Sequence, residues 1–117
     1  MKFLMLIKHS ESYRNQKIPQ GLNDAMGEFV DAGFKSGVLE DTAGLKGTAE
    51  GFRVRSGKNR LTTTDGPFTE AKEVIGGYAL LKADSKEEIV KHTKRFLEVA
   101  GQGTCEIYQL YEMPERT

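Results

Sequence analysis

The stretch GYALLKADSKEE (residues 77–88) decides how this part of the chain folds. Its first seven residues form a short apolar run, which is typical of a buried strand and too short for a helical period. Ser85 and Glu88 then have the spacing of a capping box, in which side chains satisfy free amides at the start of a helix. The helix continues along one apolar stripe made of Ile89, Phe96, Leu97 and Ala100. The stretch therefore predicts a strand followed by an α-helix.

The segments after and before this stretch predict a final strand, a first strand and another helix. Gly101 and Gly103 end the helix, and residues 104–111 alternate as a last strand does. Near the N-terminus, residues 3–7 are continuously apolar and read as a first strand. A first helix is indicated by apolar residues at three- and four-residue spacing, namely Leu22, Met26, Phe29, Val30 and Phe34, with Gly37 after them.

The middle of the chain predicts a weak second strand and a β-hairpin. Residues 38–45 indicate the strand, and residues 52–55 and 60–64 flank the turn-rich sequence SGKN. The resulting order is strand, helix, several strands, helix, strand. This order predicts an α+β fold: one domain over residues 1–117, with a ferredoxin-like antiparallel sheet, two helices on one face and an inserted hairpin.

The composition suits one globular domain and excludes several classes of partner. Of 117 residues, 38% are hydrophobic and 29% charged, which is too apolar for a disordered chain. The 17 basic and 17 acidic residues cancel, so no positive field favours nucleic acid or a membrane surface. The first apolar run stops at Lys8, too early for a signal-peptide core or a membrane span. We therefore expect a cytoplasmic protein.

The single cysteine and the two histidines predict no metal site and no cofactor. Cys105 has no CxxC partner, and its place in the last strand indicates a buried apolar residue rather than a nucleophile. His92 lies among lysines and arginine on the second helix and reads as solvated surface. Tyr78, Tyr108 and Tyr111 could line a pocket, although aromatic residues in strands are first of all packing residues.

The first strand also predicts that the protein pairs with itself. Helices can cover one side of the sheet only, yet Leu4 and Leu6 are as apolar as their neighbours Phe3, Met5 and Ile7. A homodimer with two sheets packed face to face would cover the second side. Such packing also creates pockets at the ends of the sheets, where a small molecule can bind.

The most distinctive segment is TDGPFTEAKE (residues 64–73), followed by Gly76-Gly77-Tyr78. Asp65 can accept hydrogen bonds from nearby amides, while the glycine and proline after it direct a turn. Glu70, Lys72 and Glu73 lie within one possible helical turn, so two carboxylates and an ammonium are expected beside Asp65. Gathered near the sheet edge, these groups could do proton chemistry. The alternatives are a turn cap for Asp65 and a solvated ion pair for Glu70 and Lys72.

This segment resembles the signature of the YCII-related family, in its DGPF-type branch. The N-terminal strand, the hairpin and the C-terminal helix and strand fall where that family has them, so the resemblance covers nearly the whole chain. It implies a dimeric α/β-barrel with a cleft in each subunit. It also implies an enzyme-like fold and a link to extracytoplasmic-function sigma factors, but no defined reaction. The family's better-known members pair an aspartate with a histidine of the first helix, and residues 20–36 hold no histidine here.

Other residues must therefore carry any activity or binding. His9 follows the first strand, where a sheet end would place it at a pocket mouth, and it is the favoured titrating group. Arg53 and Arg55 point to one side of a strand and could hold an anion, although such a face is usually solvated. Phe68 of the motif and Tyr78 complete the predicted ligand-binding set.

Two functions remain open from the sequence. In the first, the homodimer binds a small organic molecule in a sheet-end cleft and acts as an accessory or regulatory protein. In the second, it is a cofactor-independent enzyme, an isomerase, lyase or hydrolase, that uses His9 or Asp65 as base. Arg53 or Lys72 would then hold the anionic charge.

Overall fold

The computed structural model describes residues 1–10, 19–68 and 73–112, and these residues form an α+β fold. The central sheet is antiparallel throughout, with strands in the order β2-β5-β1-β6. These strands are β1 (Lys2–Ser10), β2 (Leu39–Gly44), β5 (Glu73–Lys82) and β6 (Thr104–Gln109). With one helix after β1 and one after β5, this is the predicted ferredoxin-like arrangement.

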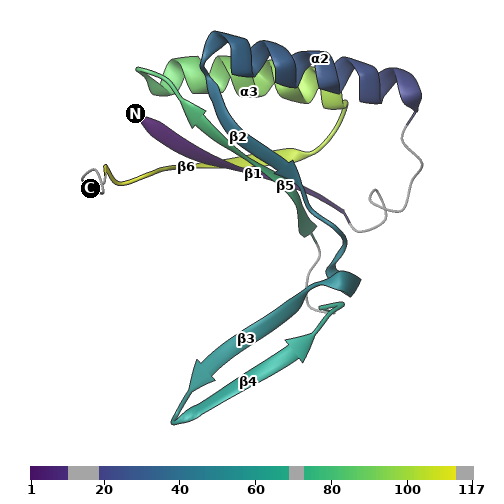
Figure 1. The fold of residues 1–117 in the computed structure, drawn as a ribbon, viewed down its shortest axis with the longest axis vertical. Helices are drawn as coiled ribbons and strands as arrows, with labels where there is room; N and C mark the ends of the chain where they lie inside the picture. The colour runs from purple at the N-terminus through teal and green to yellow at the C-terminus, as the bar shows by residue number, and fades with distance from the viewer. Residues whose placement is uncertain (11–18, 69–72, 113–117) are drawn as a thin grey trace.

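Helices α2 (Gln20–Ser36) and α3 (Lys86–Ala100) both cover one face of the sheet (Figure 1). The amide of Glu88 donates to Ser85 Oγ at 3.3 Å, so the predicted cap of α3 is confirmed. Each helix ends at a glycine with left-handed backbone, Gly37 at φ 86° and Gly101 at φ 87°, a conformation that glycine adopts without steric cost. Neither helix is both long and apolar enough to cross a membrane, within the ranges described.

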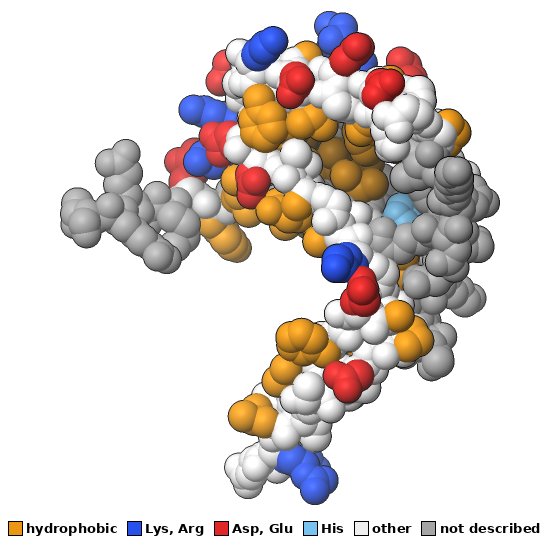
Figure 2. All heavy atoms as spheres, turned by 45° about the vertical axis from the view of Figure 1, so that its right-hand side comes forward, with side chains coloured by type: hydrophobic (Ala, Val, Ile, Leu, Met, Phe, Trp, Pro, Cys, Tyr) orange, Lys and Arg blue, Asp and Glu red, His pale blue; other side chains and the backbone are white. Residues whose placement is uncertain are grey.

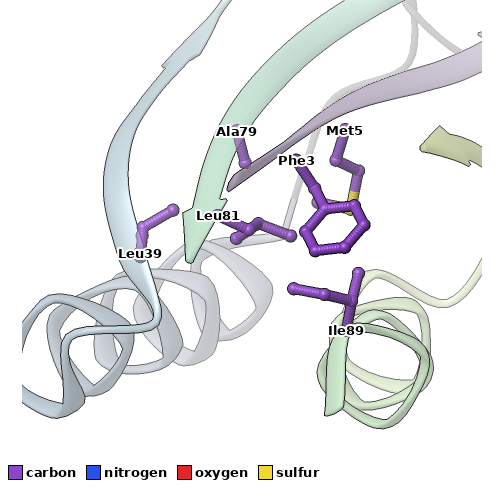
Figure 3. Close-up of a cluster of buried hydrophobic side chains, with 6 residues drawn as sticks. All are labelled: Phe3, Met5, Leu39, Ala79, Leu81 and Ile89. Carbon is purple, nitrogen blue, oxygen red and sulfur yellow. The ribbon is translucent and has the colours of Figure 1, made fainter. Parts of the chain in front are cut away.

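The hydrophobic core lies between the sheet and the helices, and α3 supplies its central side chain (Figure 3). Its buried residues are Phe3, Met5, Leu39, Ala79, Leu81 and Ile89. Alternation along the strands places Phe3 and Met5 of β1 on this face, and Leu4 and Leu6 on the other. Cys105 packs against the core as predicted, and burial raises the pKa of its thiol.

One predicted member of the first helix's apolar stripe is wrong. Phe34 is 46% exposed, and the buried residue of α2 is its neighbour Gly33. A Cβ at Gly33 would lie 3.1 Å from the Cβ of Leu39, so the helix approaches β2 closely at this glycine. That approach turns the neighbouring side chain of Phe34 outward.

The predicted hairpin forms a separate two-stranded sheet of β3 (Phe52–Gly57) and β4 (Arg60–Asp65). Its turn residues Lys58 and Asn59 both have positive φ, as two-residue hairpin turns require. The hairpin leaves the central sheet on the side away from the helices (Figure 1). We refer to β3 and β4 together as the arm.

The base of the arm is fixed by a close contact at Gly66. The 3-10 turn η1 (Thr48–Glu50) precedes β3, and the amide of Gly66 donates to the carbonyl of Gly51 at 2.8 Å. A Cβ at Gly66 would lie 1.8 Å from the carbonyl oxygen of Thr48. A glycine is therefore needed here because backbone meets backbone.

Candidate functional site

The face of the sheet opposite the helices carries an apolar strip between two tyrosine–carboxylate pairs. The cross-strand register aligns Leu6 with Tyr78 on one side and Glu106 on the other, and Leu4 with Leu80 and Tyr108. We call this surface the open face; its side chains are Leu4, Leu6, Lys8, Asp41, Tyr78, Leu80, Glu106 and Tyr108. None of these side chains is fully buried.

On one flank, Lys8, Glu106 and Tyr108 form a hydrogen-bonded cluster. Lys8 Nζ donates to Glu106 Oε1 at 2.6 Å, and Tyr108 Oη donates to Glu106 Oε2 at 2.7 Å. The bond to Glu106 raises the pKa of Lys8, the bonds from Lys8 and Tyr108 lower the pKa of Glu106, and the bond to Glu106 raises the pKa of Tyr108. At neutral pH the cluster therefore holds an ammonium, a carboxylate and a protonated phenol.

On the other flank, Tyr78 pairs with Asp41. Tyr78 Oη donates to Asp41 Oδ2 at 2.9 Å, and this bond raises the pKa of the phenol. The backbone of Tyr78 is tied to the same strand, because Thr42 Oγ1 donates to its carbonyl at 2.8 Å. Tyr78, a predicted ligand-binding residue, thus presents its ring to the open face.

A cavity of about 180 Å³ lies at the end of the sheet, where β1 finishes beside the start of β5 and the turn before β6. Its lining residues are Lys8, His9, Ser10, Glu73, Gln102, Gly103 and Thr104. We call it the sheet-end cavity. The charge of Glu73 also contributes to raising the pKa of Lys8, after the larger effect of Glu106. The cavity joins the predicted His9 to a cation and a carboxylate.

His9 occupies space that Gly76 leaves open. His9 belongs to β1 rather than following it, because the strand runs to Ser10 instead of ending at residue 7. A Cβ at Gly76 would lie 2.0 Å from His9 Nε2, so the imidazole sits over this glycine. The other nitrogen, Nδ1, lies 3.0 Å from the carbonyl oxygen of Ser10. The glycine of the Gly76-Gly77-Tyr78 motif thereby determines where the ring lies.

The polar groups of this cavity suit hydrogen bonding to an organic ligand. Lys8 supplies N–H donors, and Glu73 supplies carboxylate oxygens that accept. The imidazole can accept or donate according to its tautomer. No group of three metal-ligating side chains occurs within residues 1–10, 19–68 and 73–112.

The arginine and motif residues predicted for binding lie elsewhere. The guanidinium of Arg53 stacks over the ring of Phe68, 4.3 Å from its centroid, at the base of the arm. Arg55 is exposed farther along β3, and Asp65 is exposed at the end of β4. None of these four residues lines the sheet-end cavity. Glu70 and Lys72 lie outside the described residues.

Three sequence interpretations need correction. His92 is not solvated surface: its ring packs 4.9 Å from that of Phe29, and burial lowers its pKa. The ring lies between the two helices, near Gly33 of α2. Tyr108 and Tyr111 are not core residues, since they are 54% and 93% exposed.

Sequence reasoning missed Lys8 and Glu106, whereas it grouped Glu73 with Glu70 and Lys72. Lys8 and Glu106 are separated by 98 positions and meet only because β1 and β6 are antiparallel neighbours. The available signal was alternation: Lys8 shares a side with Leu4 and Leu6, and Glu106 lies between the core-facing Cys105 and Ile107. Alternation places each residue on a face but does not align the two strands.

Comparison with solved structures finds the same fold in an enzyme. The chain resembles 5-chloro-2-hydroxyhydroquinone dehydrochlorinase (TftG) from Burkholderia phenoliruptrix AC1100, solved in complex with 2,5-dihydroxybenzoquinone. The TM-score is 0.55 at 14% identity, over 97% of this chain and 96% of that one. At this identity the similarity shows a shared fold.

Comparison of the sequence itself with known proteins and families gives one positive result. No functionally curated protein matches the chain significantly. The model of the YCII-related domain matches residues 1–114, nearly the whole length. The resemblance carried by the DGPF segment is thereby confirmed, and the chain belongs to the YCII-related domain family.

Proposed function

We propose that this protein is a homodimer that binds a small organic molecule in the sheet-end cavity. The observation that carries the proposal is the Lys8–Glu106–Tyr108 cluster on the open face, next to that cavity. Ordered charged groups beside apolar side chains are what a small-molecule site uses to orient its ligand. An accessory or regulatory role, including one beside a sigma factor, stays a prediction from the family resemblance.

The dimer is supported by the apolar surface that the single chain leaves exposed. Leu4, Leu6 and Leu80 form a strip that neither α2 nor α3 covers, and Ile75 and Tyr108 are 41% and 54% exposed. Contiguous apolar surface of this kind usually marks an interface. A second sheet packed on the open face would cover the strip and would add a wall to the cavity.

The size and chemistry of the cavity limit the ligand. A volume of about 180 Å³ is close to the roughly 150 Å³ of a cavity that holds one benzene ring. At the cavity Lys8 offers a donor and Glu73 offers acceptors, and Glu106 beside it is bonded to Lys8, so the combined charge does not favour a strong anion. The best match is a single ring with hydroxyl and carbonyl groups. The dehydrochlorinase of the same fold was solved with 2,5-dihydroxybenzoquinone, which makes that compound a suitable first probe.

Native mass spectrometry of the purified protein tests the dimer and retained ligands together. Calorimetric titration with 2,5-dihydroxybenzoquinone then compares the wild type with Glu106→Gln and with the control Glu40→Gln. Glu40 is a carboxylate of β2 that pairs with Lys2 at 3.3 Å, and neither residue lines the sheet-end cavity. We expect a dimer whose affinity for the probe falls about tenfold in Glu106→Gln and is unchanged in Glu40→Gln.

Each result bears on a different part of the proposal. A monomeric wild type would overturn the homodimer, because the apolar strip would then need no cover. Equal affinity in the wild type and both variants would overturn the site at Lys8 and Glu106. A dimer with a retained compound of another class would keep the site and replace the ligand.

A second function, cofactor-independent proton transfer, is favoured by His9 in the same cavity as Lys8 and Glu73. An imidazole can exchange protons near neutral pH, while the ammonium stabilises developing negative charge. Recovering the probe after incubation and analysing it by mass spectrometry separates the functions. An unchanged probe supports binding alone. A product that forms with the wild type and not with His9→Gln supports catalysis.

A further inference from the structure

The arm makes the chain more extended than a compact domain of its length. The radius of gyration is 16.5 Å, whereas a compact domain of 117 residues has about 13 Å. Large apolar side chains on the arm are exposed, with Phe52 at 69%, Val54 at 62% and Leu61 at 76%. An isolated two-stranded hairpin is marginally stable in water, so a projecting arm with this surface is expected to rest on another surface.

The register of the arm separates an apolar face from a basic face. Ser56 pairs with Leu61, and Val54 with Thr63, so Phe52, Val54 and Leu61 project to one side. Arg53, Arg55 and Arg60 project to the other side by the same alternation. In Figure 2 hydrophobic side chains gather on the edge of the arm that borders a hollow, and the body of the molecule with the sheet forms the other border.

We propose that the arm clasps a second copy of this chain that occupies the hollow, with its apolar face against that copy. The proposal rests on the homodimer proposed above and adds a second contact to it. Because the arm and the open face border the same hollow, a single occupant can contact both. The arm is thus an extension of the sheet-to-sheet interface rather than a separate docking site.

The charges of the chain favour this occupant. Residues 52–65 carry four basic residues and one acidic residue, a net charge of +3. The whole chain has 17 of each, so the remainder carries 13 basic and 16 acidic residues, a net charge of −3. A basic arm and an acidic body therefore attract each other at long range, while the apolar face of the arm makes the contact. A second copy of this chain therefore offers the arm a partner of opposite net charge.

The area that a stable dimer needs also favours a shared interface. A stable interface buries about 800 Å² on each partner. Three side chains on the arm supply part of this, and the open face with Leu4, Leu6, Leu80 and Tyr108 can supply the rest. The arm would in this way increase the affinity of a dimer that the sheets alone form more weakly.

The test measures the dissociation constant of the dimer by sedimentation at several protein concentrations. The double variant Val54→Thr/Leu61→Thr removes apolar contact while threonine keeps the preference for strand. The control Arg55→Thr changes the opposite face of the same strand. We expect the dissociation constant to rise about tenfold or more in the double variant and clearly less in the control. It should also rise with salt, because the complementary charges are then screened.

Hydrogen exchange of the wild type provides a measurement that needs no variant. Backbone amides of residues 52–65 should gain protection as protein concentration rises through the dissociation constant. A dimer in which the double variant dissociates like the wild type, or in which these amides show no such gain, would overturn the clasp and leave the homodimer standing. A wild type that stays monomeric would overturn both.

Discussion

The contact between His9 and Gly76 predicts that one added methyl group changes stability in opposite directions in two backgrounds. In Gly76→Ala the new Cβ would lie 2.0 Å from His9 Nε2 and 2.6 Å from Cδ2, so the imidazole must move. Overpacking of this kind costs about 1–3 kcal/mol. Gly76 is not among the glycines with positive φ, so alanine fits the backbone there. When His9→Ala removes the ring, the same methyl group should stabilise the strand by about 0.5 kcal/mol.

These values convert to melting temperatures that calorimetry or circular dichroism resolves. With an unfolding entropy of about 2.1 cal/mol/K per residue, 1 kcal/mol shifts the melting temperature of a chain of 117 residues by about 4 °C. Gly76→Ala should therefore melt about 4–12 °C lower than the wild type. His9→Ala/Gly76→Ala should melt about 2 °C higher than His9→Ala.

The four proteins form a double-mutant cycle, compared at one protein concentration because dimerisation also affects melting. The expected coupling between His9 and Gly76 is about 2 kcal/mol. If Gly76→Ala lowers the melting temperature equally in both backgrounds, the ring does not lie over Gly76. The placement of His9 in the sheet-end cavity would then be wrong as well.

Three further predictions test the arm base, the open face and the helix layer. In a denaturation titration, Gly66→Ala should destabilise the protein by about 2 kcal/mol or more, because the new Cβ clashes with the backbone carbonyl of Thr48. The control Gly57→Ala, whose Cβ meets nothing within 4 Å, should stay within about 0.5 kcal/mol of the wild type. Glu106→Gln should lower the pKa of one tyrosine in an ultraviolet absorbance titration, because the carboxylate that raises the pKa of Tyr108 is lost. Burial lowers the pKa of His92 in the folded protein, so the unfolded chain binds a proton more readily as the pH falls below about 6.5. The melting temperature of the wild type should therefore fall as the pH is lowered through this range. In His92→Gln, which lacks the imidazole, it should fall less steeply.

Local patterns were sufficient to predict the elements that depend on neighbouring residues. The capping box at Ser85 and Glu88, the SGKN turn and the final glycine of each helix all act within a few positions. The antiparallel sheet followed because the order of strands and helices allows few topologies. Phe34 was assigned wrongly because the close approach of Gly33 to Leu39 is a tertiary contact, which the helical period does not encode.

The candidate site was predicted in part only, because most of it depends on strand register. His9 could be placed at a sheet end from its position after an apolar run. Its neighbour Lys8 was not recognised, since its partner Glu106 lies on another strand. Asp65 of the motif and Arg53 of the hairpin were also candidates because of their chemistry, yet neither lines the sheet-end cavity.

Two glycines of the distinctive segment and of the strand entry after it have separate steric roles, although Asp65 of that segment lies apart from the sheet-end cavity. Gly66 lets the base of the arm meet the backbone of Thr48, and Gly76 lets the strand accept the ring of His9. One glycine therefore positions the arm, and the other positions a side chain of the cavity. Gly66 and Gly76 are ten positions apart, so one short stretch of sequence positions both the proposed clasp and the proposed site. The two glycines therefore specify where two surfaces lie, and the polar groups of the proposed site are Lys8 and Glu73, which line the cavity, and Glu106, which accepts a hydrogen bond from Lys8.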